Sequence, residues 1–278
     1  MSDGAPFRLQ TLRESEGVAV ARFDHPHGVP VEDSEEQAAA SFQINLVERG
    51  WFRLGCEGRE WELGPGSVFL SRPGDVYTYG HAAHAEPDVC LSLAFSATLS
   101  GQVEDAFGRM ALVLPATNRL AFLFLQLEGC ITRRDSTALD VRACELVAAA
   151  ASSGEERRRL FRPGQLRWYA QRVSSVRETI EARPADEHPL WQLASQAAMS
   201  PFLFARVFRE LVGMPPHQYL ISVRLERAHA FLASGMSVTQ ACYESGFNNL
   251  SHFIRTFRAH FGYLPSQLRK RGRGQNRV

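Results

Sequence analysis

The sequence predicts an α+β protein in which a helical connector joins an N-terminal antiparallel β-barrel to a C-terminal all-α domain of two helix-turn-helix units linked by a long helix. Three observations predict this arrangement. Short segments of alternating polar and apolar residues, separated by Gly, Pro or Asp, follow one another from about residue 39. Apolar residues recur at helical spacing after about residue 102, and one helical pattern occurs twice near the C-terminus.

Changes in composition set the expected domain boundaries. A polar segment with an acidic run is expected to form an N-terminal arm, and a charged stretch that ends in Pro163 and Gly164 indicates a linker. The expected domains are the arm at 1–36, the barrel at 37–104, a helical connector with candidate dimerisation helices at 105–153, the linker at 154–164 and the helix-turn-helix domain at 165–273, with its units at about 189–212 and 237–261.

The two halves of the 278-residue chain carry opposite charges. Residues 1–160 hold 15 Arg against 23 Asp and Glu, a net charge of −8. Residues 161–278 hold 16 Lys and Arg against 7 acidic residues, a net charge of +9. A basic half favours a polyanionic partner, although charges also segregate by chance.

The first residues lack the charged start and apolar run of a secretory signal, and no apolar stretch is long enough to span a bilayer. We therefore expect a cytoplasmic protein without a membrane partner. Five cysteines, an odd count without a C-x-x-C pair, favour reduced and packed thiols over a disulfide framework or a zinc ribbon.

Six short strand patterns follow the arm, from SFQINLVERG to VCLSLAF, with no helical pattern between them. Such close spacing predicts an antiparallel sandwich or small barrel, whose interior can be either core or cavity. Two amphipathic helices are then expected at Arg119–Gly129 and Leu139–Ala151. These helices could pack on the barrel, on each other or on a second subunit.

The basic half contains an internal repeat. Residues 200–220 match residues 249–269 at a constant offset of 49, with seven identities that include Phe204 with Phe253 and Arg206 with Arg255. The repeat indicates one supersecondary unit used twice. Ser200 is the expected N-cap of the first repeated helix, Pro201 its first residue, and Asn248 the expected cap of the second.

Helical periodicity separates a buried and an outward face on each repeated helix. The outward residues are expected to be Phe202, Ala205, Arg206 and Arg209 in the first unit, and Ser251, Arg255 and Arg258 in the second. Between the units, Pro215–Gly235 is expected to form one helix, roughly 30 Å long at 1.5 Å per residue. Such a helix could place both units in successive major grooves, about 34 Å apart.

Residues 165–271 resemble the DNA-binding domain of the AraC/XylS family of transcription regulators. The resemblance is carried by a GF pair, an S-x-F-x-R-x-F segment, a G-x-x-P step and an RLERA segment: Gly246, Phe247, Ser251, Phe253, Arg255, Phe257, Gly262, Pro265 and Arg224–Ala228. The N-terminal half is similar to the cupin-like sensor barrels that this family often carries, most clearly over Leu63–Tyr79.

The resemblance implies which residues contact DNA. The implied base-contacting residues are Phe202, Ala205, Arg206, Leu250, Ser251 and Arg255. Arg206 and Arg255 could pair bidentately with guanine, or could instead only neutralise phosphate. Leu250 falls on the core side of the helical periodicity. Expected phosphate contacts are Arg209, Arg258, Arg269 and Lys270, although the last two could belong to a solvated terminus.

The barrel is expected to hold a small polar organic effector rather than a metal. Candidate effector-binding residues are Trp51, Trp61, Tyr77, Tyr79 and His81, although the same aromatic residues would suit any barrel core. A metal site could be assembled from His25, His27, His81, His84 and Cys90. The cupin resemblance opposes the usual metal centre, because no His-x-His pair precedes Gly50 and Tyr77 stands where a later ligand is expected. We expect no metal and no cofactor.

Taken together, these features predict a sequence-specific DNA-binding transcriptional regulator, an activator controlled by a small-molecule effector in its N-terminal domain. Its expected partners are double-stranded promoter or operator DNA, the effector, RNA polymerase and, as a candidate, a second copy of the chain. It is not expected to be an enzyme. The alternatives are a cupin metalloenzyme fused to a DNA-binding domain, and a regulator without ligand whose barrel only mediates dimerisation.

Overall fold

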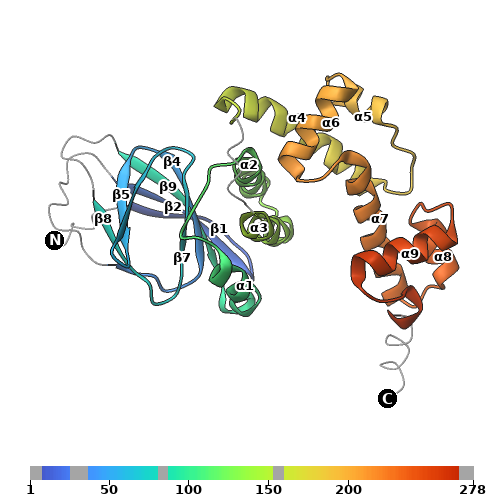
Figure 1. The fold of residues 1–278 in the computed structure, drawn as a ribbon, viewed down its shortest axis with the longest axis horizontal. Coiled ribbons are helices and arrows are strands. Elements are labelled where there is room, and N and C mark those ends of the chain that lie inside the picture. The colour runs from blue at the N-terminus through green and yellow to red at the C-terminus, as the bar shows by residue number, and fades with distance from the viewer. Residues whose placement is uncertain (1–7, 26–36, 81–86, 153–159, 269–278) are drawn as a thin grey trace, which may run out of the picture. The chain divides into compact units, whose positions relative to one another are not determined.

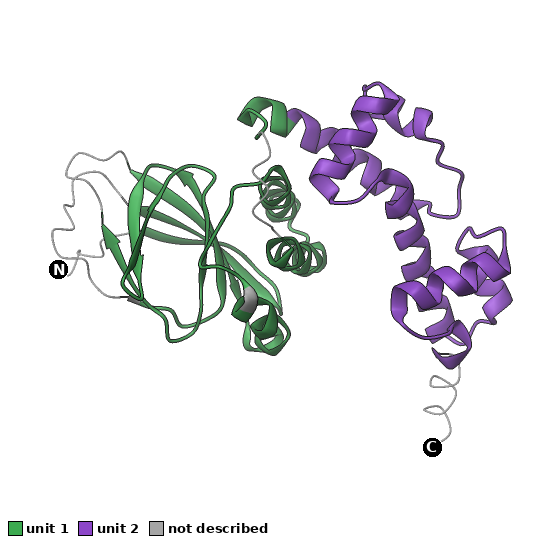
Figure 2. Ribbon diagram, in the orientation of Figure 1, with its two compact units in different colours: residues 1–167 green, residues 168–278 purple. Residues whose placement is uncertain are grey.

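The computed structural model describes residues 8–25, 37–80, 87–152 and 160–268. The chain divides into two compact units, residues 1–167 and residues 168–278, and each is treated by itself (Figure 2). The first unit combines antiparallel sheets with helices, and the second is helical. The predicted fold class is therefore confirmed. No helix in the described ranges is both long and apolar enough to cross a membrane.

The strands of the first unit form two antiparallel sheets (Figure 1). The first sheet has the order β1 (Arg8–Glu14), β2 (Val18–His25), β9 (Asp88–Phe95), β4 (Gln43–Arg49), β7 (Val68–Ser71) and β10 (Val113–Leu114). The second has the order β3 (Gln37–Ala38), β8 (Val76–Gly80), β5 (Phe52–Cys56) and β6 (Arg59–Leu63). The six predicted strands correspond to β4–β9.

Part of the predicted arm is sheet rather than a polar extension. Strand β2 pairs with β9 from Val18 opposite Phe95 to His25 opposite Asp88, and β1 pairs with β2. Val18 and Val20 are almost fully buried. These valines alternate with alanines, which is the two-residue period of a strand. The flanking residues are polar, so the composition of the segment alone indicated an extended arm and not a strand.

Side chains of the first sheet alternate between two buried faces. On β4, Gln43, Asn45 and Val47 face the second sheet, whereas Ile44 and Leu46 face the other way. Helices α1 (Ala97–Arg109), α2 (Asn118–Arg133) and α3 (Ser136–Ala151) lie along that other side (Figure 1). Helix α1 contacts β9, α3 contacts β2, and α2 packs on α3. The structure therefore uses its helices to bury the outer face of the sheet.

A polar contact joins this sheet to α2. Arg22 on β2 donates to both carboxylate oxygens of Glu48 on β4, at 2.9 and 3.2 Å. Glu128 of α2 lies beside Glu48, and burial together with this neighbouring carboxylate raises the pKa of Glu128. The outer face of the sheet is thus apolar near β9 and charged where β4 meets α2.

The second unit contains the predicted duplicated helices. Its elements are α4 (Pro163–Ala182, whose first residues belong to the first unit), α5 (Leu190–Gln196), α6 (Pro201–Val212), α7 (Pro216–Ala233), α8 (Val238–Glu244) and α9 (Leu250–Phe261). Helices α6 and α9 both have 12 residues. Ser200 caps α6 as expected, but Asn249, not Asn248, caps α9. Both helices end at a glycine with positive φ, Gly213 and Gly262.

Helix α7 links the two helix-turn-helix units. It has 18 residues, which corresponds to about 27 Å at 1.5 Å per residue. Buried Arg177 of α4 donates to the hydroxyl of Tyr219 on α7 at 2.9 Å, and Tyr219 donates to Glu181 of α4. These contacts hold α4 against the start of α7.

The turn of the second helix-turn-helix approaches the loop that follows α4. Gly246 has φ +94°, and a Cβ there would lie 2.7 Å from the Cα of Ala185 and 2.9 Å from Nε of Arg224. Arg224, on α7, donates to the carbonyls of Pro184 at 2.7 Å and Asp186 at 3.0 Å. The loop after α4, the middle of α7 and the α8–α9 turn therefore meet at one point.

Replacing Gly246 with alanine tests this contact. We expect Gly246→Ala to cost about 2–5 kcal/mol of unfolding free energy, because left-handed strain adds to overlap with the Ala185 backbone. Gly262→Ala is the matched control. Its φ is +80° and a Cβ at this position would meet no atom within 4 Å, so only strain of about 1–2 kcal/mol is expected. Denaturant unfolding followed by circular dichroism measures both losses, and equal losses would contradict the close approach.

Candidate functional site

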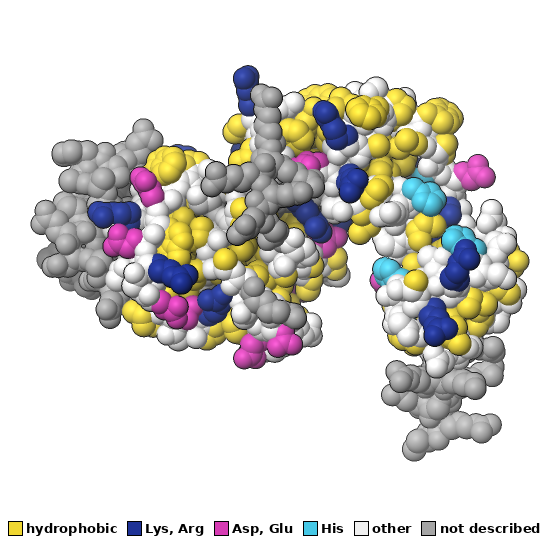
Figure 3. Space-filling model, viewed as in Figure 1, with side chains coloured by type: hydrophobic (Ala, Val, Ile, Leu, Met, Phe, Trp, Pro, Cys, Tyr) yellow, Lys and Arg dark blue, Asp and Glu magenta, His cyan; other side chains and the backbone are white. Residues whose placement is uncertain are grey.

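The outward faces of α6 and α9 carry exposed arginines at equivalent positions. Arg206 and Arg209 lie on α6, and Arg255 and Arg258 lie on α9. None of the four guanidinium groups has a hydrogen-bond or ion-pair partner among the described residues. Figure 3 shows basic and histidine side chains gathered around the α9 end of this unit. The two helices therefore present uncompensated positive charge on matching faces.

Other arginines of the unit are used internally. Arg177 contacts Tyr219, Arg224 binds backbone carbonyls, and the guanidinium of Arg172 lies 3.7 Å from the ring centre of Trp168. These arginines stabilise the unit itself, whereas the four exposed arginines of α6 and α9 remain available to bind a polyanion.

The remaining predicted base-contacting residues differ in exposure. Phe202 is 80% exposed and Ser251 is exposed, whereas Ala205 is half-buried. Leu250 is partly buried and packs against the core of the second unit, as the helical periodicity indicated. Arg269 and Lys270 lie outside the described residues.

The turns that orient α6 and α9 are built differently. In the first unit the turn places exposed Ala198 at φ +52°, followed by buried Met199. In the second unit Gly246 takes the positive-φ position, followed by buried Phe247. In both, an apolar residue enters the core directly after the left-handed residue, so each turn fixes the start of the helix that follows.

A cavity of about 220 Å³ lies between the two sheets of the first unit. We call it the barrel cavity. Aromatic, small apolar and amide or hydroxyl side chains from both sheets line it: Phe23, Ala38, Ala39, Ala40, Gln43, Asn45, Phe52, Phe69, Ser71, Tyr77, Tyr79 and Cys90. Burial raises the pKa of the Cys90 thiol, which is therefore neutral at physiological pH.

The barrel cavity includes two of the five predicted effector-binding residues, Tyr77 and Tyr79. Trp51 does not line it; this side chain is 58% exposed and covers Gly64. Trp61, on β6 at the edge of the second sheet, packs against the barrel core without lining the cavity. His81 lies outside the described residues.

Sequence reasoning missed the polar part of the lining, Gln43, Asn45 and Ser71. Their signal is present in the sequence, because Gln43 and Asn45 occupy alternate positions of one strand and so share a face. Gln43 lies opposite Ser71 in the pairing of β4 with β7. Polar residues at successive inward positions indicate a cavity rather than a packed core.

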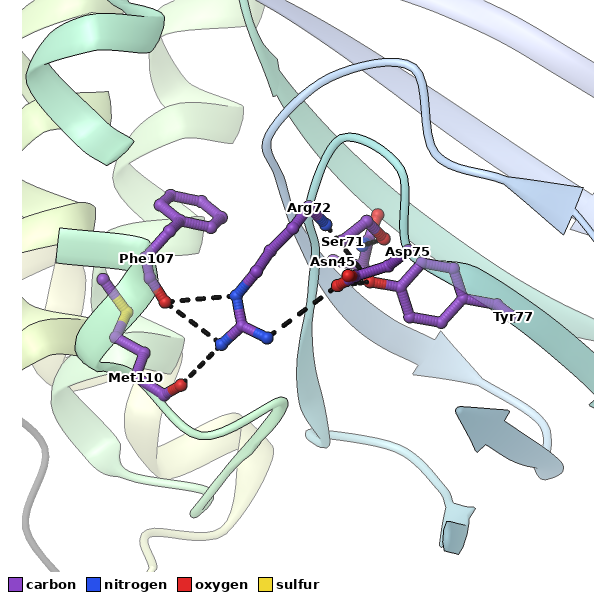
Figure 4. Close-up of polar contacts among 7 residues, drawn as sticks. All are labelled: Asn45, Ser71, Arg72, Asp75, Tyr77, Phe107 and Met110. Atoms are coloured by element: carbon purple, nitrogen blue, oxygen red, sulfur yellow. Dashed lines mark hydrogen bonds and ion pairs between the residues drawn. The ribbon is translucent and has the colours of Figure 1, made fainter. Parts of the chain in front are cut away.

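Tyr77 connects the barrel cavity to α1 through a polar network (Figure 4). Its hydroxyl donates to Asp75 at 2.8 Å and accepts from the backbone N–H of Arg72 at 3.1 Å. The Arg72 guanidinium donates to the carbonyl of Phe107 at 3.1 and 3.2 Å and to that of Met110 at 2.7 Å. Arg72 thereby binds the carbonyls at the end of α1, where a cation also complements the helix dipole.

Within the described residues, no three His, Cys, Asp or Glu side chains come together as a metal site. The side chains of His25, His27, His81 and His84 lie outside the described part of the chain, so the candidate metal set is represented only by Cys90.

Two family models match the sequence. A model described as the AraC-binding-like domain matches residues 5–154, and one described as a helix-turn-helix domain matches residues 193–271. An uncharacterized HTH-type transcriptional regulator of Haemophilus influenzae is 35% identical over 102 residues, which is 36% of this chain and 34% of that protein. The HTH-type transcriptional activator RhaS of Shigella dysenteriae is 25% identical over 256 residues, which is 87% of this chain and 90% of RhaS.

Two solved structures each cover 37% of this chain. A probable AraC family transcriptional regulator from Rhodopseudomonas palustris is 32% identical with a TM-score of 0.35, covering 37% of this chain and 97% of that one. The DNA-binding domain of AdpA, solved with a target DNA, is 28% identical with a TM-score of 0.36, covering 37% and 95%. These low structural scores add nothing to the two family-model matches.

The contact between Arg72 and α1 can be tested by substitution. We expect Arg72→Met to lower the free energy of unfolding by about 1.5–3 kcal/mol, because two helix-end carbonyls lose a charged donor. Arg59→Met, at an exposed arginine on β6, is the control and should change stability by less than about 0.5 kcal/mol. Thermal unfolding compares them. Equal effects would mean that Arg72 does not stabilise the end of α1.

Proposed function

Because the chain belongs to the AraC/XylS family of DNA-binding transcriptional regulators, we propose that it activates transcription from a specific DNA site under the control of a small molecule held in the barrel cavity. The observation that carries the DNA-binding half of the proposal is the set of four arginines without protein partners among the described residues, on the matching faces of α6 and α9. The barrel cavity supports the effector half.

Within this proposal, the two recognition helices read DNA unequally. Arg206 and Arg255 sit at equivalent positions and are assigned to base edges, where a guanidinium can pair with O6 and N7 of guanine. Arg209 and Arg258 lie one turn further along and are assigned to phosphate. Ser251 adds a polar group to α9, whereas Phe202 and Ala205 offer α6 only apolar contact. The second helix therefore supplies more of the polar readout.

Leu250 is a partly buried member of the proposed contact set. Its packing against the core leaves only part of the side chain for DNA, which suits a single apolar contact such as a thymine methyl group.

A substitution at Arg255 tests base readout. We expect Arg255→Ala to weaken binding to the preferred site by about 1–3 kcal/mol and to relax specificity at one base pair. Arg258→Ala is the control, with a similar loss on all sequences and a smaller salt dependence. Selection of bound sites from random DNA, followed by titrations of matched and mismatched duplexes, measures both. A uniform loss for Arg255→Ala would assign Arg255 to phosphate.

Activation and RNA polymerase contact are proposed from the likeness to RhaS, which is described as a transcriptional activator. In this scheme the effector changes DNA affinity by stabilising one arrangement of the chain over another. The barrel performs no chemistry. Deletion of residues 1–160 with DNA affinity and effector response both unchanged would refute the regulatory role of the first unit.

We also propose a homodimer through α3. Val141, Cys144 and Ala148 are exposed on one face of this helix, at helical spacing, and Val141 is 54% exposed. They border a hollow whose other side is formed by residues that include Leu99 of α1. An apolar stripe of this kind favours packing against the same stripe of a second copy.

Solution mass tests the dimer. We expect two copies for the unaltered chain and one for Val141→Asp, because a buried carboxylate without a partner opposes association. Thr132→Asp, at an exposed position of α2, should leave the mass unchanged. A single-copy mass for the unaltered chain at micromolar concentration would contradict the proposal.

A further inference from the structure

We propose that the barrel cavity binds a small, uncharged, single-ring molecule whose polar group hydrogen-bonds to both Asn45 and Tyr79. The inference rests on the effector role proposed for the barrel and adds the chemical class of the ligand. Its evidence is the size of the cavity, the charge of its walls and the polar atoms that the described part of the protein leaves unpaired there.

The size and walls of the cavity favour one ring. A cavity of about 150 Å³ binds benzene, so a volume of about 220 Å³ accommodates a ring with one substituent. Phe23, Phe52, Phe69, Tyr77 and Tyr79 surround this space. Aromatic rings pack well on such walls in offset or edge-to-face contact.

The described residues of the cavity walls are uncharged, which favours a neutral ligand over an ion. Among the described lining residues there is no Arg, Lys, His, Asp or Glu. The closest charged groups in the network of Figure 4 have other partners, because Arg72 binds α1 carbonyls and Asp75 accepts from Tyr77. Burial raises the pKa of the Tyr79 phenol and of the Cys90 thiol, so both are neutral at physiological pH. An ion transferred into this cavity would lose its hydration without gaining a counter-charge from the described lining residues.

The carbonyl oxygen of Asn45 and the hydroxyl of Tyr79, which come from opposite walls, lack hydrogen-bond partners among the described residues. The Asn45 amide nitrogen donates to the carbonyl of Phe69 at 3.4 Å and to Ser71 Oγ at 3.2 Å, while its carbonyl oxygen has no hydrogen bond to a described residue. Because a carbonyl can only accept, the contact with Phe69 assigns this end of the Asn45 amide as the nitrogen. The Tyr79 hydroxyl also has no described partner, in contrast to Tyr77, which is fully engaged.

These groups define a complementary ligand. Asn45 comes from the first sheet and Tyr79 from the second, so a ligand between the sheets can reach both. Asn45 offers an acceptor and Tyr79 a donor, and a primary amide on a ring supplies the matching N–H and C=O. Benzamide has this combination, and benzoate has nearly the same shape with a negative charge.

Calorimetric titration of the full-length chain with benzamide and with benzoate tests the inference. We expect benzamide to bind with a millimolar or lower dissociation constant and benzoate to bind at least about tenfold more weakly, because of the desolvation cost of a carboxylate. Tyr79→Phe should weaken benzamide binding about fivefold, the value of one hydrogen bond. It should leave the melting temperature unchanged, since the hydroxyl has no described partner in the protein.

Tyr243→Phe, at an exposed tyrosine of the second unit, is the control and should bind benzamide like the unaltered chain. The inference is overturned if benzoate binds as tightly as benzamide, if benzamide gives no binding heat at its solubility limit, or if Tyr79→Phe binds it unchanged. These results are independent of DNA. Failure of the DNA-binding proposal would leave the titrations as they are, and failure of the titrations would leave the effect of Arg255→Ala intact.

Discussion

The DNA-binding unit depends on one close approach, the backbone of Gly246 against Pro184 and Ala185. A side chain at residue 246 would occupy the position of that loop, and Arg224 closes the same contact from α7 through two backbone carbonyls. Contact with the segment that leads into α5 therefore fixes the position of the α8–α9 turn. As a result, the relative placement of α6 and α9 does not depend on the stiffness of α7 alone, which would suit the proposed contact of both helices with one stretch of duplex.

The helical half was largely predictable from sequence because its determinants are local. The cap at Ser200 and the glycines at the ends of α6 and α9 each act within one or two turns of helix, and the repeat at an offset of 49 residues presents such local signals twice. The predicted cap at Asn248 was wrong by one residue. Either of the two adjacent asparagines has a side chain that can cap α9, and only the backbone geometry decides between them. Burial of Leu250 also followed directly from periodicity.

The barrel was less predictable, since its determinants are pairings between distant segments. Residues 8–25 belong to the sheet because β2 pairs with β9, which lies about seventy residues further along the chain. No local sequence signal identifies β9 as the pairing strand. The aromatic content suggested Trp51 and Trp61 as cavity residues, but the direction of a side chain depends on strand register and on turn position. Asn45 and Ser71 become a polar pair only after β4 and β7 are placed side by side.

Strand β4 has a consequence for how the first unit can respond. This strand separates the barrel cavity from the helices on the outer face of the sheet. Asn45 faces the cavity, whereas Ile44 and Glu48 face outward. Because side chains are closely packed on the outer side, a displacement of β4 that widens the barrel cavity would press on the helices there. Glu48, with Arg22 and Glu128 beside it, lies where that displacement reaches α2. A ligand that displaced β4 would therefore also displace the contact between Glu48 and α2.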